Sequence, residues 1–146
     1  MNTNQSDHNY QTDRRNGRII AFQALFSLNF SDTPPAELLK FGWLDKKYSA
    51  RAIKYATFLI KGTLENLKTI DEMIQSKLRN WNYDRISNID RAILRFSVFS
   101  LVFEKELSKK IIINEAIEIV KLFGSEDSHK FINGILDAIK RSEEQS

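Results

Sequence analysis

The sequence predicts an all-α fold, a compact single domain of six or seven helices. Apolar residues make up 42% of the 146 residues, and they recur at intervals of three and four, the spacing of one helix face. Only two prolines and five glycines interrupt the chain, which favours helices over a turn-rich β fold. The one β-branched run, residues 111–113, has no evident partner strand elsewhere. At this length one domain is expected.

Composition excludes several classes of function. With no cysteine, the chain has no disulfide, no thiol catalysis and no cysteine metal site. It holds two histidines and shows no glycine-rich phosphate loop, metalloprotease motif or nucleophile elbow. We therefore expect no enzyme activity, no catalytic residue, no cofactor and no metal. No apolar run approaches the roughly 20 residues that span a bilayer, and the polar start is no signal peptide, so we expect a cytoplasmic protein.

The first half of the chain is expected to hold a tail and three or four helices. Residues 1–12 are polar and predict a flexible N-terminal tail, followed by a helical domain over residues 13–146. A helix over residues 13–30 is indicated by its apolar spacing. Residues 31–35 end that region, and either Pro34 or Pro35 opens a short helix through Phe41. Residues 46–80 predict a long helical stretch, with a bend either near Gly62 or around residues 66–69.

The second half predicts a buried central helix and two more. After a loop at residues 80–84, Ser87 with Asp90 three residues later resembles a helix-capping pair. The following helix is apolar on nearly every side, which predicts the centre of the fold. Residues 111–113 are interpreted as a loop entering a helix over 114–123. Gly124 is expected to end it in a left-handed conformation, and Ser125 to cap a last helix over 126–141.

Three arginines fall within five residues: Arg14, Arg15 and Arg18. They lie where the predicted tail becomes a helix, so their planar side chains can reach phosphate oxygens. Amide groups of the first helical turn would add to such an anion site. Arginine is poorly placed there against the helix dipole, which favours a functional reason. The alternative is a solubilising first turn, and local sequence does not decide between the two.

A second candidate site lies in residues 124–134, GSEDSHKFING. Lys130 is suited to a phosphate contact, and an exposed Phe131 is suited to stacking on an unpaired base. The structural alternative is stronger on local grounds: Phe131 also fits the apolar stripe of the last helix. His129 is then an ordinary polar residue, and Gly134 is explained by close helix packing.

Three stretches together resemble the NusB family of antitermination factors. They are Arg14-Arg15-x-x-Arg18 with AFQALFS at residues 21–27, IDRAILR at 89–95, and INEAIEIVK at 113–121 followed by FGSEDSHKFING at 123–134. Their order and spacing match the family from about Arg14 to Arg141. The last block is long and highly specific.

The resemblance implies two packed three-helix bundles and an RNA-binding role in transcription antitermination. The implied ligand is boxA-type single-stranded RNA of ribosomal RNA leader transcripts. The implied partner is NusE, a small-subunit ribosomal protein, which links the RNA to RNA polymerase; some members form homodimers that hide the RNA surface. Asp90 would face NusE. The RNA surface carried over by position comprises Arg14, Arg15, Arg18, Gln23, Asp127, Lys130 and Phe131.

Two other functions compete with this one. The chain could be a helical interaction module whose main act is self-association. It could also resemble the NusB-like accessory domain that precedes some ribosomal RNA cytosine methyltransferases. Such an enzyme needs a cofactor-binding domain and a catalytic cysteine, and this chain contains neither.

Overall fold

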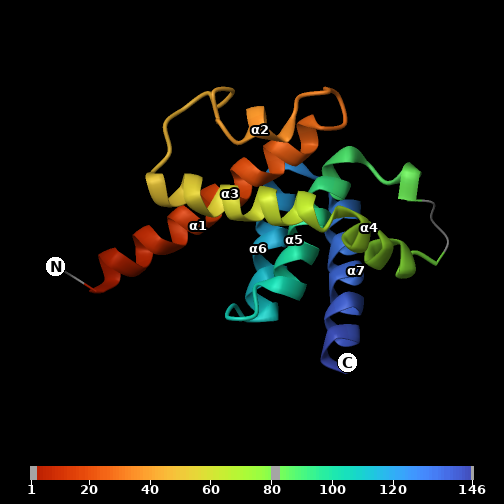
Figure 1. Cartoon of the computed structure of the whole chain (residues 1–146). Helices are drawn as coiled ribbons and strands as arrows, with labels where there is room; N and C mark the ends of the chain where they lie inside the picture. The colour runs from red at the N-terminus through yellow and green to blue at the C-terminus, as the bar shows by residue number, and fades with distance from the viewer. Residues whose placement is uncertain (1–2, 80–82, 146) are drawn as a thin grey trace. The chain divides into compact units, whose positions relative to one another are not determined.

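The computed structural model describes residues 3–79 and 83–145, and within them the chain is all-α, as predicted (Figure 1). The chain divides into two compact units, residues 1–61 and 62–146, so that the boundary falls inside one helix. None of the described helices is long and apolar enough to cross a membrane. The described residues form seven α-helices: α1 (Thr3–Ser27), α2 (Pro35–Leu38), α3 (Ala50–Glu65), α4 (Leu67–Ser76), α5 (Asn88–Phe103), α6 (Lys109–Phe123) and α7 (Glu126–Gln145).

Helix α1 begins at Thr3, so the predicted start at residue 13 is wrong. The apolar spacing used for that prediction locates the buried face of a helix, which begins only near Gly17. Residues 8–12 are exposed, and the helical backbone continues through them because its hydrogen bonds need no apolar neighbour. The arginine cluster therefore lies inside a helix and not at its start.

Within the first unit, α1 and α3 approach each other closely. A Cβ atom on Gly17 would lie 2.9 Å from Cδ2 of Tyr55 and 3.1 Å from the carbonyl oxygen of Ala52. At the same level the hydroxyl of Ser49 donates to Asp13 Oδ1 at 2.6 Å. Because any side chain at position 17 would collide with α3, glycine allows this contact.

Helix α2 starts at Pro35 as predicted but ends at Leu38, short of Phe41. Phe41 has a φ of 57°, a left-handed conformation that a continuing α-helix cannot contain. The indole Nε1 of Trp43 then donates to the Leu38 carbonyl oxygen at 2.9 Å. The same oxygen also accepts from the Phe41 amide at 3.2 Å, so the indole adds a second bond at the end of the short helix.

The long stretch is two helices, and it breaks at Asn66, which confirms the second of the two predicted positions. The side-chain amide of Asn66 donates to the Gly62 carbonyl oxygen at 2.8 Å, so it takes over a bond of the helix end. Gly62 itself remains helical. Its missing side chain leaves room for the ring of Phe99, which a Cβ atom there would overlap.

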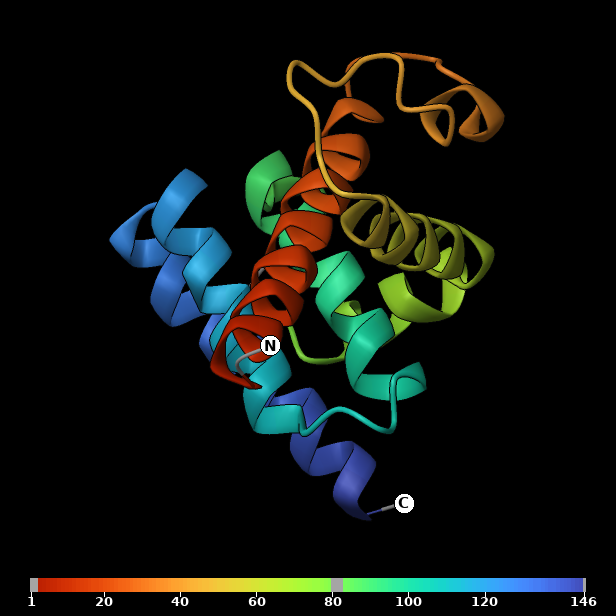
Figure 2. The ribbon, with the colours of Figure 1, turned by 90° about the vertical axis from the view of Figure 1, so that its left-hand side faces the viewer.

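In the second unit, α5 is the central helix, as predicted. It contacts α4, α6 and α7, which surround it in Figure 2, and its buried residues lie on all its sides. The cap is also as predicted, since the Ser87 hydroxyl accepts from the Asp90 amide at 3.1 Å. Of the predicted loop at 80–84, residues 80–82 lie outside the described residues, and Tyr83–Arg85 form a 3-10 turn.

Two predictions at the ends of α6 are wrong. Residues 111–113 are helical, because Ser108 caps a helix that starts at Lys109 and accepts from the Ile111 amide at 3.3 Å. Gly124 is extended, with φ −103° and ψ −169°, and not left-handed. The predicted cap of α7 is confirmed, since the Ser128 amide donates to the Ser125 hydroxyl at 3.1 Å. Helix α7 then continues past residue 141 to Gln145.

Candidate nucleic-acid interface

The arginine face comprises Arg14, Arg15 and Arg18 on α1, and the aromatic ring of Tyr55 on α3 orients two of them. The guanidinium carbon of Arg14 lies 4.0 Å from the centre of the Tyr55 ring and 4.9 Å from that of Tyr10. Arg18 lies 5.3 Å from the Tyr55 ring, and its Nη2 donates to the Tyr55 hydroxyl at 3.4 Å. Arginine over an aromatic face is held by cation–π attraction.

Exposure separates the roles of the arginines. Arg18 is only 6% exposed, so its main contacts are inside the protein. Arg15 is exposed and Arg14 is half-buried, which leaves their guanidinium groups accessible to a phosphate. Gln23, also predicted for this surface, lies on α1 and is half-buried.

The predicted contribution of helix-starting amides to this site is wrong. Helix α1 begins at Thr3, so the amides near Arg14 and Arg18 lie in the helix interior, where they bond to carbonyl groups of the preceding turn. The argument that these arginines lie unfavourably against the helix dipole is wrong for the same reason, because they are not at the helix start. Any anion at the arginine face must therefore be bound by side chains.

The second unit contains a hollow of about 490 Å³ that brings four predicted residues together. Asp127, Lys130 and Phe131 come from α7, and Asp90 comes from α5. We call it the Phe131 hollow. Phe131 is half-buried, so its ring lines the hollow without being wholly inside the core. Asp90, expected on the NusE-facing side, thus lines the same hollow as the three residues expected to contact RNA.

Sequence reasoning missed the opposite wall of this hollow. Arg85, Ile86 and Ser87 line it from the segment that precedes α5. Nothing in their local spacing indicated a site, since their position depends on how the segment before α5 is held against α4 and α5. Gly134 was expected to allow close helix packing, but a Cβ atom there would meet nothing within 4 Å. His129 is exposed.

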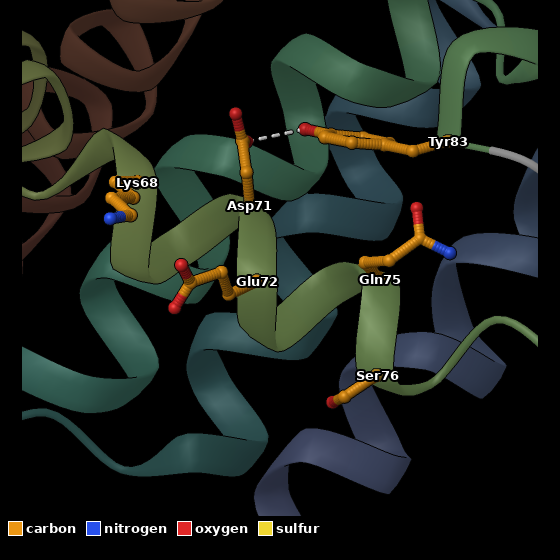
Figure 3. Close-up of a pocket in the computed structure, with 6 residues that line it drawn as sticks. All are labelled: Lys68, Asp71, Glu72, Gln75, Ser76 and Tyr83. Carbon is orange, nitrogen blue, oxygen red and sulfur yellow. Dashed lines mark hydrogen bonds between the residues drawn. The ribbon is translucent and has the colours of Figure 1, made fainter.

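The segment that precedes α5 is held in place by hydrogen bonds among Asp71, Tyr83 and Arg95, which we call the Tyr83 network. The Tyr83 hydroxyl donates to Asp71 Oδ1 at 2.6 Å (Figure 3). Arg95 binds both Asp71 oxygens, with Nε–Oδ1 at 3.0 Å and Nη2–Oδ2 at 2.9 Å. Burial, reinforced by the bond to Asp71, raises the pKa of the Tyr83 hydroxyl above its ordinary value of 10.0, so it stays a donor. The network fixes Tyr83 to α4 and α5, two residues before Arg85.

Asp90 is the unusual acid of the Phe131 hollow. It is 8% exposed, and its Oδ1 is buried without a hydrogen bond to any residue that the structure describes. Burial raises the pKa of this carboxyl above its ordinary value, although hydrogen bonds with Ser128 and Ser87 oppose the change. Asp90 lines the hollow, and an incompletely paired acid is suited to a cationic group from a partner, which would have to uncover the buried Oδ1 on binding.

A model of the NusB family matches residues 15–141. The transcription antitermination protein NusB of Leptospira biflexa is 42% identical over 132 residues, which cover 90% of this chain and 94% of that protein. The chain belongs to the NusB family. Its NusB relative in Treponema denticola is 43% identical over 129 residues, covering 87% of this chain and 95% of that protein.

Solved NusB structures share the fold. The structure of T. maritima NusB matches with a TM-score of 0.80 at 41% identity. The match covers 88% of this chain and 90% of that chain. A second neighbour is described as antitermination factors NusB and NusE in complex with double-stranded RNA. It has a TM-score of 0.77 at 27% identity, covering 90% of this chain and 98% of that chain. The NusB match contains the Phe131 hollow and all of the arginine face except Arg14.

Proposed function

We propose that this chain is an RNA-binding transcription antitermination factor without catalytic activity, acting in the cytoplasm. Its RNA is boxA-type single-stranded RNA of ribosomal RNA leader transcripts, bound together with NusE and linked to RNA polymerase. Family membership carries the proposal, because relatives at about 40% identity over most of both chains are named transcription antitermination proteins. Two surfaces of suitable chemistry support it.

The arginine face supplies phosphate contacts. Arg15 is exposed and Arg14 is held over Tyr55, so both present planar groups that can each bind two phosphate oxygens. Arg18 acts through Tyr55, since the two side chains are hydrogen-bonded and buried. Gln23, half-buried on the same helix, offers an amide that can bond to a base or a ribose.

The Phe131 hollow supplies base recognition. The half-buried ring of Phe131 offers a face for stacking on an unpaired base. Lys130 provides a charge for a neighbouring phosphate, and the Asp127 carboxylate is suited to accept from a base amino group. All three line the same hollow of about 490 Å³, which is ample for one base.

Asp90 is proposed to receive NusE. Its buried carboxyl is under-bonded within the described residues, so a lysine or arginine from a partner would satisfy it. Such a pair gains most where water is excluded. This assignment predicts that Asp90→Asn weakens NusE binding more than it weakens binding of RNA alone.

The decisive experiment measures binding of a boxA-like single-stranded RNA across a salt series, with and without purified NusE. We expect tighter binding with NusE and a negative slope of affinity against salt, because phosphate contacts release counterions. A scrambled RNA of the same length is the control. If neither RNA binds at low salt, even with NusE, the proposed function is wrong.

Self-association is proposed as a competing state of the same chain. The second unit exposes large apolar side chains, among them Leu122 at 59% and Ile111 at 47%, and such residues favour protein contacts. Sedimentation with and without RNA tests it. A dimer that RNA dissociates is expected, whereas a dimer that binds RNA intact would show that the dimer does not hide the RNA surface.

A further inference from the structure

The first unit contains a second basic surface apart from the arginine face. A hollow of about 500 Å³ is lined by the segment between α2 and α3 and by Ile53 of α3. Three lysines and two aromatic residues shape it, and we call it the lysine hollow: Lys40, Lys46, Lys47, Phe41 and Tyr48. Asp45 is its one acidic residue.

The positive charge of the protein is concentrated in this segment. Residues 40–54 hold five basic residues and one acidic residue, a net charge of +4, whereas the whole chain carries +3. The rest of the chain is therefore slightly acidic. Lys40 pairs with Glu37 at 2.9 Å. Lys46 and Lys47 are exposed, and neither forms an ion pair with a residue that the structure describes.

Aromatic side chains lie among these charges. Tyr48 is half-buried, and the ammonium group of Lys46 lies 5.2 Å from the centre of its ring. Phe41, also half-buried, lies 6.0 Å from the ring of Trp43. Lysines interleaved with accessible aromatic faces are typical of single-strand nucleic-acid surfaces, where bases stack and phosphates pair.

The backbone at Phe41 adds an independent observation. Its φ of 57° is the only positive φ among the described residues, and a bulky side chain adopts this conformation only with backbone strain. Gly42, the residue that would take this conformation freely, is next in the chain and does not use it. Such strain is typically kept at functional sites, and here it belongs to a residue that lines the hollow.

The lysine hollow adjoins the arginine face through a short, defined connection. Tyr48 is followed by Ser49, whose hydroxyl donates to Asp13 Oδ1 at 2.6 Å. Asp13 directly precedes Arg14 on α1. Figure 1 shows the light-orange segment descending to the start of α3, which crosses α1. A strand bound at the arginine face can therefore continue over the lysine hollow within one unit.

We propose that the lysine hollow binds single-stranded RNA that flanks the boxA-type element. Lys46 and Lys47 contact phosphates, while Tyr48 stacks on a base. The inference rests on the proposed RNA-binding function and extends it to nucleotides outside the recognised sequence. An acidic protein surface is the competing occupant. It would pair with the lysines, but it would not account for the aromatic side chains of Phe41 and Tyr48 that line the hollow.

The test compares two RNAs, a boxA-like core and the same core extended at both ends by about ten uridines, a length within the site size of single-strand binders. The variant is Lys46→Gln with Lys47→Gln. Its matched control is Lys109→Gln with Lys110→Gln, which removes an adjacent lysine pair from the second unit. A second variant, Tyr48→Leu, keeps an apolar side chain but removes the stacking face. Circular dichroism checks that all remain folded.

We expect wild type to bind the extended RNA more tightly than the core. The Lys46/Lys47 variant should lose roughly tenfold in affinity for the extended RNA at 0.1 M salt, and its salt slope should fall by about 1.4, the contribution of two phosphate contacts on a single strand. Its affinity for the core, and both affinities of the control, should stay unchanged. Tyr48→Leu should weaken the extended RNA severalfold without changing the salt slope.

Three results would overturn the inference in distinguishable ways. If the core binds but the extension adds nothing, or the Lys46/Lys47 variant equals wild type, the hollow is not an RNA surface and the proposed function stands. If the variant instead loses only NusE binding, the hollow docks protein. If wild type binds neither RNA at low salt, the proposed function fails together with its extension.

Discussion

The guanidinium group of Arg14 lies over the face of Tyr55, 4.0 Å from the ring centre. Arg18 approaches the same ring and donates to its hydroxyl group. One aromatic side chain of α3 thus orients two arginines of α1. The consequence is that the arginine face depends on how the two helices pack as much as on its own sequence.

Replacing Tyr55 should therefore affect both folding and RNA binding. We expect Tyr55→Leu to lower the free energy of unfolding by about 2 kcal/mol, because a buried aromatic ring and its cation–π contacts are lost. RNA affinity should fall severalfold. Tyr55→Phe is the matched control, since it keeps the ring and removes the hydroxyl that accepts from Arg18 at 3.4 Å. Urea unfolding and RNA titration measure both; equal effects of the two variants would show that the ring does not orient the arginines.

The three arginines should separate by exposure. Arg15→Ala is expected to weaken RNA binding and reduce its salt slope by about 1, because an exposed phosphate contact is lost. Its free energy of unfolding should change by less than about 0.5 kcal/mol. Arg18→Ala should instead destabilise the fold, since this side chain is buried against Tyr55. The prediction fails if Arg15→Ala leaves the salt slope at its wild-type value.

The Tyr83 network should support the Phe131 hollow from a distance. Asp71→Asn breaks the bidentate pair with Arg95, which is partly buried, and should cost about 2 kcal/mol of stability. Tyr83→Phe removes two hydrogen bonds, the one donated to Asp71 and the one accepted from Arg95 Nε at 3.1 Å, and should cost about 1–2 kcal/mol. Both should also weaken RNA or NusE binding, because the segment carrying Arg85 loosens. If both variants bind RNA and NusE as wild type does at temperatures where they remain folded, the network stabilises the fold but does not support binding.

Asp90 should make stability depend on pH. Burial raises the pKa of its carboxyl above the ordinary value of 3.8, so the folded chain holds a proton that the unfolded chain has lost. Stability from this group is therefore present below 3.8 and is lost as pH rises through the folded pKa. Asp90→Asn removes the titration, so the stability of the variant relative to wild type should increase as pH rises from 3.8 through the folded pKa. A relative stability that is flat across this range, measured by urea unfolding, would contradict the prediction.

Two glycines should respond oppositely to the same change. A Cβ atom on Gly62 would overlap the Phe99 ring, so Gly62→Ala should destabilise the protein by about 2 kcal/mol or more. Gly134 is exposed in α7 and has open space around its Cα. Gly134→Ala should stabilise it by up to about 1 kcal/mol, through helix propensity alone. Thermal unfolding of both variants measures these changes. If both variants change in stability with the same sign, the contact between position 62 and Phe99 does not determine the effect of Gly62→Ala.

Much of the fold was predictable because its signals are local. The apolar spacing indicated every long helix, the two serine caps at Ser87 and Ser125 were visible as short patterns, and α5 was recognisable as central because apolar residues surround it. Helix ends were less predictable. The start of α1 at Thr3 and that of α6 at Lys109 were missed, since a polar first turn carries no apolar periodicity.

The sequence by itself determined the helical fold, the family and the residue types of the candidate surfaces, because each depends on neighbours three or four positions apart or on contiguous motifs. Tertiary structure decided what those residues do. It buried Arg18 against Tyr55, which lies 37 residues away in the chain, and it joined Asp90 to the Phe131 hollow. It also placed Arg85 on the opposite wall through the Tyr83 network. These contacts join distant segments, and only the packing of helices brings such segments together.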